Sequence, residues 1–439
     1  MVKGKLILKG IIELLSPAII GSGMEENSDL DVMKDSAGRP FIPATSFIGV
    51  LRHKTENVGI DSSKIEYFWG TKRSDEENST QSSIACSDLL PIGNVSVSFR
   101  DGVRINNKKG IAEDKAKFDY EIIDKGSTFS LNLEITLNGV EDDFKKQMLA
   151  TIVELLKNEK VRVGAKTSSG FGRMKLKDHK ICEFDFSRKQ DVVNWFKYRR
   201  TDILPESTVF QYSPIKLSEN KFTVDAFFTI KNSLIVRSYS VDPNLPDTEH
   251  IKSGNDYVLP GTSLKGAIRA RAERIINTLE KPMKILDFLF GSAGANVDKP
   301  IKGRLIVEET ILKDFPSEVQ TRIKIDRFTG GTIETALMET KPLFRGKNES
   351  LFHVRLTIEN PEPHEVGLIL LLLKDLWTGD IAVGGEKSIG RGVLEGKTAE
   401  IKYNSLNIVI DDPSKLKSED KKKLQDFVDA LVNYGGETC

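Results

Sequence analysis

The sequence predicts an α+β protein built from two tandem copies of one ferredoxin-like domain. Residues Arg39–Arg52 read RPFIPATSFIGVLR, and residues Asp256–Arg269 repeat the pattern as DYVLPGTSLKGAIR. Two more pattern pairs occur in the same order, so that the three offsets are 218, 217 and 220 residues (247 − 29, 260 − 43 and 384 − 164). Ordered matches at nearly constant spacing indicate an internal duplication, so a site in one copy should have a counterpart in the other.

The order of elements within each copy predicts the ferredoxin-like plan. Each copy opens on a run rich in β-branched and other apolar residues, which predicts a strand. A Pro-x-Thr-Ser turn follows, in which Thr and Ser are suitable helix N-caps. A second strand, a polar and irregular middle segment, a third strand, an apolar helix and a Gly-rich stretch complete the copy. The order β-α-β, β-α-β is that of a split βαβ fold with insertions.

The duplication also predicts the domain boundaries. We expect a first domain at 1–202, a joint at 203–219, a second domain at 220–410 and a charged helical tail at 411–439. A chain of 439 residues is too long for one hydrophobic core and suits two or three domains.

Composition limits the class of protein. The 64 basic and 64 acidic residues give a net charge of zero, which disfavours a uniformly basic nucleic-acid binder but permits a local basic groove. Three cysteines without metal-ligand spacing fit a reducing cytoplasm rather than a disulfide framework. No apolar run approaches the length of a membrane span, so we expect no membrane association.

The Gly-rich stretches Gly164–Arg173 and Gly384–Gly392 are candidate phosphate sites. Glycines allow a close approach of backbone N–H groups to an anion, and Lys166, Arg173, Lys387 and Arg391 would add positive charge. Neither stretch has the ending of a phosphate-binding P-loop, and neither fits the dinucleotide fingerprint. A plain turn remains the alternative for each.

Carboxylates precede each Pro-x-Thr-Ser turn. Asp29, Asp31 and Asp35 lie there in copy one, and Asp242 and Asp247 in copy two. Beside a phosphodiester, such a group can hold Mg²⁺ or orient an attacking hydroxyl, although loop carboxylates are commonly only solvated. His250 is the one histidine in these loops, and its counterpart is Val32, so a nuclease site with paired histidines is disfavoured.

The middle segments combine basic and apolar residues. Lys108 and Lys109 lie in copy one, and Arg327 and Phe328 in copy two, each set interleaved with apolar side chains. On an extended hairpin such residues can wedge into a nucleic-acid strand and contact its backbone. A surface hairpin with an apolar underside is the equally weighted alternative.

These motifs together resemble the RAMP superfamily, and most closely the backbone subunits of type III CRISPR effector complexes. The resemblance rests on Leu8–Gly23, the Asp29 loop, IPATS, GFGR, LPGTSLKGAIR and GEKSIGRG, and it covers the chain except its tail. Two such modules in one chain resemble the double-module subunits of type III-D-like effectors. The resemblance implies RNA-recognition-type cores, each with an extended thumb hairpin, stacked along a guide RNA.

The resemblance also implies residue roles. Guide-backbone contacts fall on the Gly-rich loops and on the helices after the turns: Ser46, Arg52, Lys166, Ser169, Arg173, Ser263, Lys265, Arg269, Lys387 and Arg391. Copy one departs from the family pattern, since Ile48 stands where copy two has Lys265. The thumb roles fall on Lys108, Lys109, Arg327 and Phe328.

Target-RNA cleavage in the family depends on an Asp before the turn, which places catalysis and Mg²⁺ binding at Asp29 and Asp247, with Asp31 and Asp242 as rivals. A carboxylate with Mg²⁺ would align an RNA 2′-hydroxyl for attack on the adjacent phosphorus, a route that DNA lacks. The expected partners are a guide RNA, a single-stranded target RNA and other effector subunits. A non-catalytic guide scaffold and a guide-processing endoribonuclease stay open; the latter expects a histidine near the Gly-rich loop, where His179 is the nearest.

Overall fold

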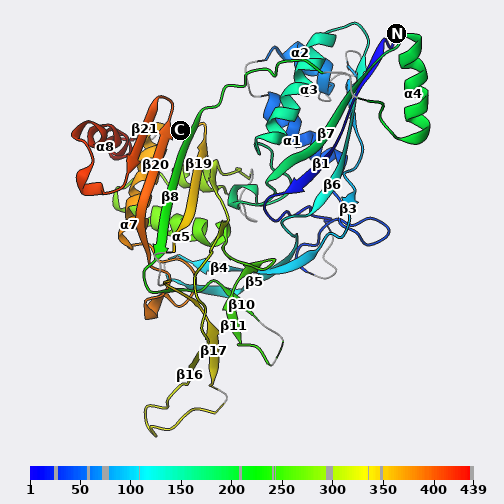
Figure 1. Cartoon of the computed structure of the whole chain (residues 1–439). Helices are drawn as coiled ribbons and strands as arrows, with labels where there is room; N and C mark the ends of the chain where they lie inside the picture. Colours follow the sequence, from blue (N-terminus) through cyan, green and yellow to red (C-terminus); the bar gives the residue numbers. More distant parts are fainter. Residues whose placement is uncertain are drawn as a thin grey trace. The chain divides into compact units, whose positions relative to one another are not determined.

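The structure is a computed structural model that describes residues 1–23, 28–56, 60–71, 79–107, 109–206, 210–239, 242, 244–292, 300–334, 336–346 and 350–435. The chain forms two compact units. The first comprises Met1–Val103, Asp114–Thr167 and Phe171–Glu219, and the second comprises Arg104–Glu113, Ser168–Gly170 and Asn220–Cys439. The described residues between Thr201 and Lys221 form neither helix nor strand. Both units mix helices with mainly antiparallel sheets, which confirms the α+β class (Figure 1).

The first unit is built on a sheet with the order β2-β6-β1-β7. Its centre is β1 (Gly4–Leu14), which pairs antiparallel with β6 (Thr128–Leu137) and with β7 (Met174–Asp185). The short strands β2 (Ile84–Cys86) and β3 (Pro91–Ile92) pair with successive parts of β6.

The second unit repeats this order of matched strands as β14-β19-β8-β20-β21. Its centre is β8 (Lys221–Ile230), between β19 (Phe352–Glu359) and β20 (Leu394–Tyr403). At the edges, β14 (Leu305–Val307) pairs with β19 and β21 (Leu406–Ile410) pairs with β20.

Helices cover both faces of the first sheet. Leu6 and Leu8 pack in one cluster with residues of α1 (Ala44–Glu56), α2 (Ser62–Trp69) and α3 (Asp142–Lys157). Because side chains alternate along a strand, Ile7 points to the other face. There it packs under Tyr198 of α4 (Lys189–Thr201), a helix that the sequence analysis did not predict.

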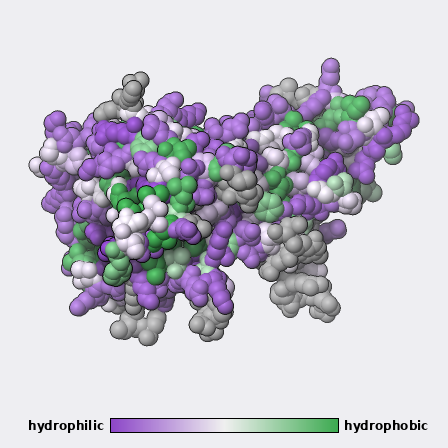
Figure 2. Space-filling view, turned by 90° about the horizontal axis from the view of Figure 1, so that it is seen from below, coloured by the Kyte–Doolittle hydropathy of each residue, from purple (hydrophilic) through white to green (hydrophobic). Residues whose placement is uncertain are grey.

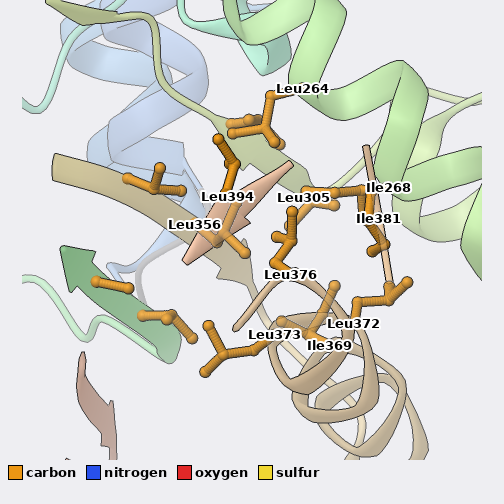
Figure 3. Packing of buried hydrophobic residues seen from close by; sticks show 14 of the residues in the cluster. Leu264, Ile268, Leu305, Leu356, Ile369, Leu372, Leu373, Leu376, Ile381 and Leu394 are labelled. Carbon is orange, nitrogen blue, oxygen red and sulfur yellow. The ribbon is translucent and has the colours of Figure 1, made fainter. Parts of the chain in front are cut away.

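The core of the second unit lies between one face of its sheet and the helices α5 (Gly261–Thr278), α6 (Lys284–Phe290) and α7 (Pro363–Thr378). Figure 3 shows Leu264 and Ile268 of α5 converging with Leu372 and Leu376 of α7 on strand residues such as Leu356. The tail helix α8 (Ser418–Val432) packs on α7. Gly367 permits this contact, because a Cβ there would lie 2.1 Å from the carbonyl oxygen of Phe427.

The middle segment of copy one is more regular than the sequence indicated, whereas the described residues of 324–336 in copy two form neither helix nor strand, as expected. In copy one, β4 (Val97–Asn106) and β5 (Ile111–Ile123) form a long antiparallel hairpin. In copy two, a four-stranded sheet has the order β10 (Arg237–Tyr239), β11 (Thr248–His250), β17 (Met338–Lys341) and β16 (Gln320–Arg322). The expectation of irregular structure was wrong for copy one, where Val97, Phe99, Val103 and Ile105 alternate with other residues at a strand-like period.

Five two- to four-residue strands complete the second unit: β9 (Ser233–Leu234), β12 (Lys252–Ser253), β13 (Asp256–Leu259), β15 (Thr310–Ile311) and β18 (Leu343–Phe344). The helices after the Pro-x-Thr-Ser turns begin earlier than predicted. Pro260 is the N-cap of α5, and Asp88 accepts the Ala44 N–H of α1 at 2.8 Å, so Thr and Ser lie in the first turn instead of capping it. Among the described helices, none has the length and apolar composition needed to cross a bilayer.

Candidate nucleic-acid interface

The two Gly-rich loops have one backbone conformation. Gly164 and Gly384 have φ values of +83° and +85°, and one-turn 3-10 helices follow at Thr167–Ser169 and Lys387–Ile389. The residue before each 3-10 helix, Lys166 or Glu386, is left-handed, with φ values of 53° and 55°. The structural register between the loops is therefore 220 residues, so Lys166 corresponds to Glu386 and Phe171 to Arg391.

Aromatic rings hold the loop of copy one. The Lys166 Nζ lies 3.5 Å from the ring centroid of Tyr120 and 4.7 Å from that of Phe118, both on β5. Burial lowers the pKa of Lys166 to about 8, while the two π faces favour its charged form. Arg100 lies over the Phe171 ring at 5.6 Å. The lysine ammonium is thus anchored above two rings rather than extended into solvent.

Ion pairs hold the loop of copy two. The Glu386 carboxylate lies 3.2 Å from Arg237, 2.9 Å from Arg322 and 3.2 Å from Arg391. The Arg391 side chain is only 2% exposed, so this predicted RNA-binding residue faces the protein interior. Lys387, next to Glu386, is exposed.

The residues predicted on the first helices divide into exposed and tethered groups. Ser46 is exposed in the first turn of α1, and Ser263 is half-buried in that of α5. Arg52 and Arg269 donate to the carbonyl oxygens of Gly70 and Gly291, at 3.0 and 2.9 Å, and so tie each first helix to the end of the second. Both arginines therefore have a role in packing, which is separate from any contact with RNA.

Lys265, a predicted contact to the guide backbone, is buried, whereas a lysine that binds phosphate at the surface would be exposed. Its side chain is 7% exposed, and its Nζ donates to the Leu305 carbonyl oxygen at 2.9 Å. Burial, followed by the neighbouring Arg269, lowers the pKa of Lys265 to about 7. Ser169 and Arg173 in the loop of copy one are half-buried, and the Arg173 guanidinium lies 3.8 Å from Glu159.

The proposed catalytic carboxylates occupy equivalent positions. Asp29 and Asp247 are both exposed, and each accepts a backbone N–H from the neighbouring strand. The donors are Asp119 at 2.9 Å and Glu339 at 2.8 Å. The rivals differ: Asp31 is 5% exposed and accepts the Ser28 hydroxyl, whereas Asp242 binds the backbone and side chain of Asn244 in a turn.

The sequence motifs did not predict the second carboxylate of each pair. Asp119 and Glu339 are themselves acidic, at an offset of 220 residues, so both copies place two carboxyl residues together. In copy one the contact is reciprocal, since the Asp29 N–H donates to the Asp119 carboxylate at 3.2 Å. In copy two the Glu339 carboxylate accepts the Thr321 hydroxyl. The signal was present as an acidic residue at matched positions of the two middle segments.

The thumb candidates lie on the hairpins of the middle segments. Lys109 is exposed at the turn between β4 and β5, while Lys108 lies outside the described residues. Arg327 and the fully exposed Phe328 lie in the turn between β16 and β17. Several exposed apolar residues share that hairpin: Ile323, Ile325, Leu337 and Met338. Figure 2 views the molecule from below and shows apolar residues, in green, among the polar ones on that side of the protein.

His250 has a structural role. It is fully buried, its Nδ1 lies 3.2 Å from the Val236 N–H, and its Nε2 lies 2.8 Å from the Val258 carbonyl oxygen. Burial lowers the pKa of His250 to about 4, which is outside the range of a base at neutral pH.

This pKa predicts a loss of stability in acid. Between pH 6.5 and about 4 the unfolded chain binds a proton that the folded state excludes, so stability falls as the pH falls through this window. The expected contribution is roughly 3 kcal/mol in the free energy of unfolding. Urea unfolding across this pH range should show a steeper fall for the wild type than for His250→Gln, and parallel curves would contradict the prediction.

The two halves of the chain match one known protein family. The family model described as RAMPs, the RAMP superfamily, matches residues 11–175 and 227–395. The chain therefore belongs to the RAMP superfamily, a group of CRISPR-associated RNA-binding proteins, and it contains two regions of that family. No curated protein matches the chain.

Among the described residues, no group of three or more His, Cys, Asp or Glu side chains is arranged to hold a metal ion. Two carboxylates with the remaining positions filled by water or substrate phosphate are nevertheless a usual environment for Mg²⁺. In copy one, two reciprocal hydrogen bonds, each from a backbone N–H to a carboxylate, join Asp29 and Asp119.

Proposed function

We propose that the chain is a guide-RNA-binding backbone subunit of a type III CRISPR ribonucleoprotein, of the type III-D-like kind with two modules, and that it cleaves guide-complementary target RNA. The observation that carries the proposal is the matched pair of exposed carboxylates, Asp29 and Asp247, each positioned by a backbone N–H of the equivalent strand. Membership of the RAMP superfamily across both halves supports RNA as the ligand.

The strand orders support two ferredoxin-like, RNA-recognition-type cores, since β2-β6-β1-β7 and β14-β19-β8-β20 follow the same plan. The β4–β5 hairpin and the β16–β17 hairpin are then the thumbs, which would press Lys109 or Phe328 against nucleic acid. The exposed Ser46 and Lys387 are the best placed of the predicted contacts to reach a phosphate.

In the proposed reaction an RNA 2′-hydroxyl attacks the adjacent phosphorus. The 2′-hydroxyl gives its proton to solvent, the P–O5′ bond breaks, the 5′-oxygen takes up a proton from solvent and leaves as a 5′-hydroxyl, and a 2′,3′-cyclic phosphate remains on the upstream fragment. Asp29 or Asp247 would orient the hydroxyl or hold a divalent cation, which when bound would neutralise charge on the phosphate. Asp119 would fix the backbone of Asp29 through its hydrogen bond to the Asp29 N–H.

The test uses the assembled complex with its guide. A labelled complementary RNA should be cut in Mg²⁺ and remain whole in EDTA, and a DNA target should bind without cleavage. Tight binding of the target without any cutting would indicate that the chain is a non-catalytic guide scaffold. Cutting of a guide precursor alone would favour a processing endoribonuclease, although neither Gly-rich loop contains a histidine.

Asp119 is expected to act as a positioning residue for Asp29. Asp119→Ala should raise the Mg²⁺ concentration for half-maximal cutting at the Asp29 site by about tenfold, the usual scale for a group that orients a ligand. Asp119→Asn keeps the hydrogen-bond acceptor and should restore most of the activity. Equal defects in the two variants would show that the Asp119 charge, and not its acceptor, is what matters.

A further inference from the structure

A cavity of about 510 Å³ lies in the first unit, outside the sites described above. Its lining comes from three segments of that unit: the C-terminal half of α3, the middle of β7, and residues 210–214. None of the residues assigned to the guide RNA, the thumbs or the metal is among its described lining residues. The volume lies in the range of roughly 300–1,000 Å³ that small-molecule sites occupy. The cavity therefore has the size of a ligand site that the RNA-binding function leaves unused.

The outer wall of the cavity, residues 210–214, is tethered to α3. The Lys146 Nζ lies 5.1 Å from the ring centroid of Tyr212. Just beyond the wall, the Ile215 N–H donates to the Thr151 hydroxyl oxygen at 2.9 Å. Contacts on both sides of the wall form the cavity before any ligand enters, and such preorganisation favours binding.

The second unit closes the equivalent groove with its own chain. There β21 pairs with β20 along Ala399–Tyr403, which correspond to residues 179–183 in the 220-residue register of the loops. The tail helix α8 packs on α7, the counterpart of α3, and its Phe427 joins the core cluster. In the described part of the first unit, β7 instead forms the edge of its sheet, and residues 210–214 are neither helix nor strand. The open cavity is thus a property of copy one and not a requirement of the fold.

Two aromatic side chains line one part of the cavity. Phe210 and Tyr212 are both half-buried, and their ring centroids lie 5.3 Å apart with an angle of 40° between the ring planes. Val153 and Ile181 add apolar surface to the same lining. Aromatic side chains of this kind are platforms on which a nucleobase can stack.

The polar lining suits an anionic group. Burial, followed by the charge of the nearby Lys157, lowers the pKa of His179, so the imidazole and the ammonium share one neighbourhood. An anion between them would favour the charged form of both.

A carboxylate and an amide complete the polar lining. Glu154 and Asn158 lie on the same face of α3 as Lys157, because residues three and four apart are neighbours on a helix. Their side chains can pair with the edge of a base or with ribose hydroxyls, groups that a simple aromatic acid lacks. A ring, a sugar and an anion in one molecule describe a nucleotide.

We propose that this cavity binds a free nucleoside monophosphate, with the base against Phe210 and Tyr212 and the phosphate at Lys157 and His179. The site goes beyond the RNA-binding and cleavage functions proposed above and does not depend on them. The 5′-phosphorylated end of an RNA offers the same chemistry, so the two sources are separated by experiment.

The first arm titrates AMP, GMP, CMP and UMP into the full chain by calorimetry. At least one should bind, and His179→Ala and Phe210→Ala should each weaken that binding by about tenfold. His53→Ala, which removes an exposed histidine of α1, should leave the affinity unchanged. Lys157→Ala changes an exposed residue and provides the same test if the melting temperature shows that His179→Ala folds poorly. Absence of binding by all four nucleotides, or equal losses in the His179 and His53 variants, would overturn the site.

The second arm uses the assembled complex with its guide. The nucleotide should bind there with the affinity measured for the full chain, and His179→Ala should leave the cutting of target RNA intact. Loss of nucleotide binding when the guide is present would show that the nucleotide had occupied the guide site. Tighter binding of a 5′-phosphorylated RNA oligonucleotide than of the mononucleotide, sensitive to His179→Ala, would overturn the assignment to a free nucleotide in favour of an RNA end.

Discussion

Asp29→Ala should remove one cleavage product of a guide-paired target RNA, and Asp247→Ala should remove another at a different position. Each residue lies exposed in its loop and accepts a backbone N–H from the equivalent strand residue, Asp119 or Glu339. Loss of an exposed carboxylate costs folding little, about 0.5 kcal/mol, so target binding should persist. The measurement is a denaturing gel of end-labelled RNA cut by the assembled complex.

The rival carboxylates provide the controls. Asp242→Ala alters an exposed turn and should leave every product intact. If Asp31→Ala removes a product while Asp29→Ala does not, the catalytic position in copy one is wrong. If cutting persists in all four variants, the catalytic proposal fails and the scaffold function takes its place. A 2′-deoxy sugar at the cut should block cleavage. Cleavage of such a target would exclude attack by the internal hydroxyl.

Gly392→Ala should severely destabilise the second unit, whereas Gly390→Ala should be mild. Both glycines have a φ of +82°, so both variants pay the same left-handed cost of about 1–2 kcal/mol. A Cβ on Gly392 would also lie 1.9 Å from the Val383 carbonyl oxygen, while a Cβ on Gly390 would meet no heavy atom of the described structure within 4 Å. We expect Gly392→Ala to cost about 4 kcal/mol or more.

Chemical unfolding of the two variants separates the two effects. Their common φ makes Gly390→Ala a control for backbone strain, so the difference between them measures the close approach alone. Gly172 repeats the situation in copy one, with a φ of +73° and 1.9 Å to the Val163 carbonyl oxygen, and its Ala variant should destabilise the first unit. Equal costs for Gly390→Ala and Gly392→Ala would show that the loop relaxes around the new methyl group.

The sequence predicted the elements whose residues repeat at a local period. The runs that form β1, β8 and β19 are apolar and β-rich, and the helices α3 and α7 have continuous apolar patterns. The α4 helix was not predicted because charged residues are interspersed among its apolar and aromatic ones, so no continuous apolar pattern marks it in the sequence. On the sheet, Tyr198 is buried while Arg199 and Arg200 remain exposed to solvent.

The duplication by itself determined that Asp29 and Asp247 correspond, and that two Gly-rich loops recur, because short motifs at a constant offset are a property of the chain alone. Only the tertiary structure decided which charged side chains are exposed and which are buried or paired. Asp119 and Glu339 reach those loops from strands some 90 residues away, Lys265 and Arg391 turn inward, and Glu386 gathers three arginines from separate strands and a loop. A sequence pattern records residue type and spacing, whereas burial and ion pairing depend on which distant segments the fold brings together.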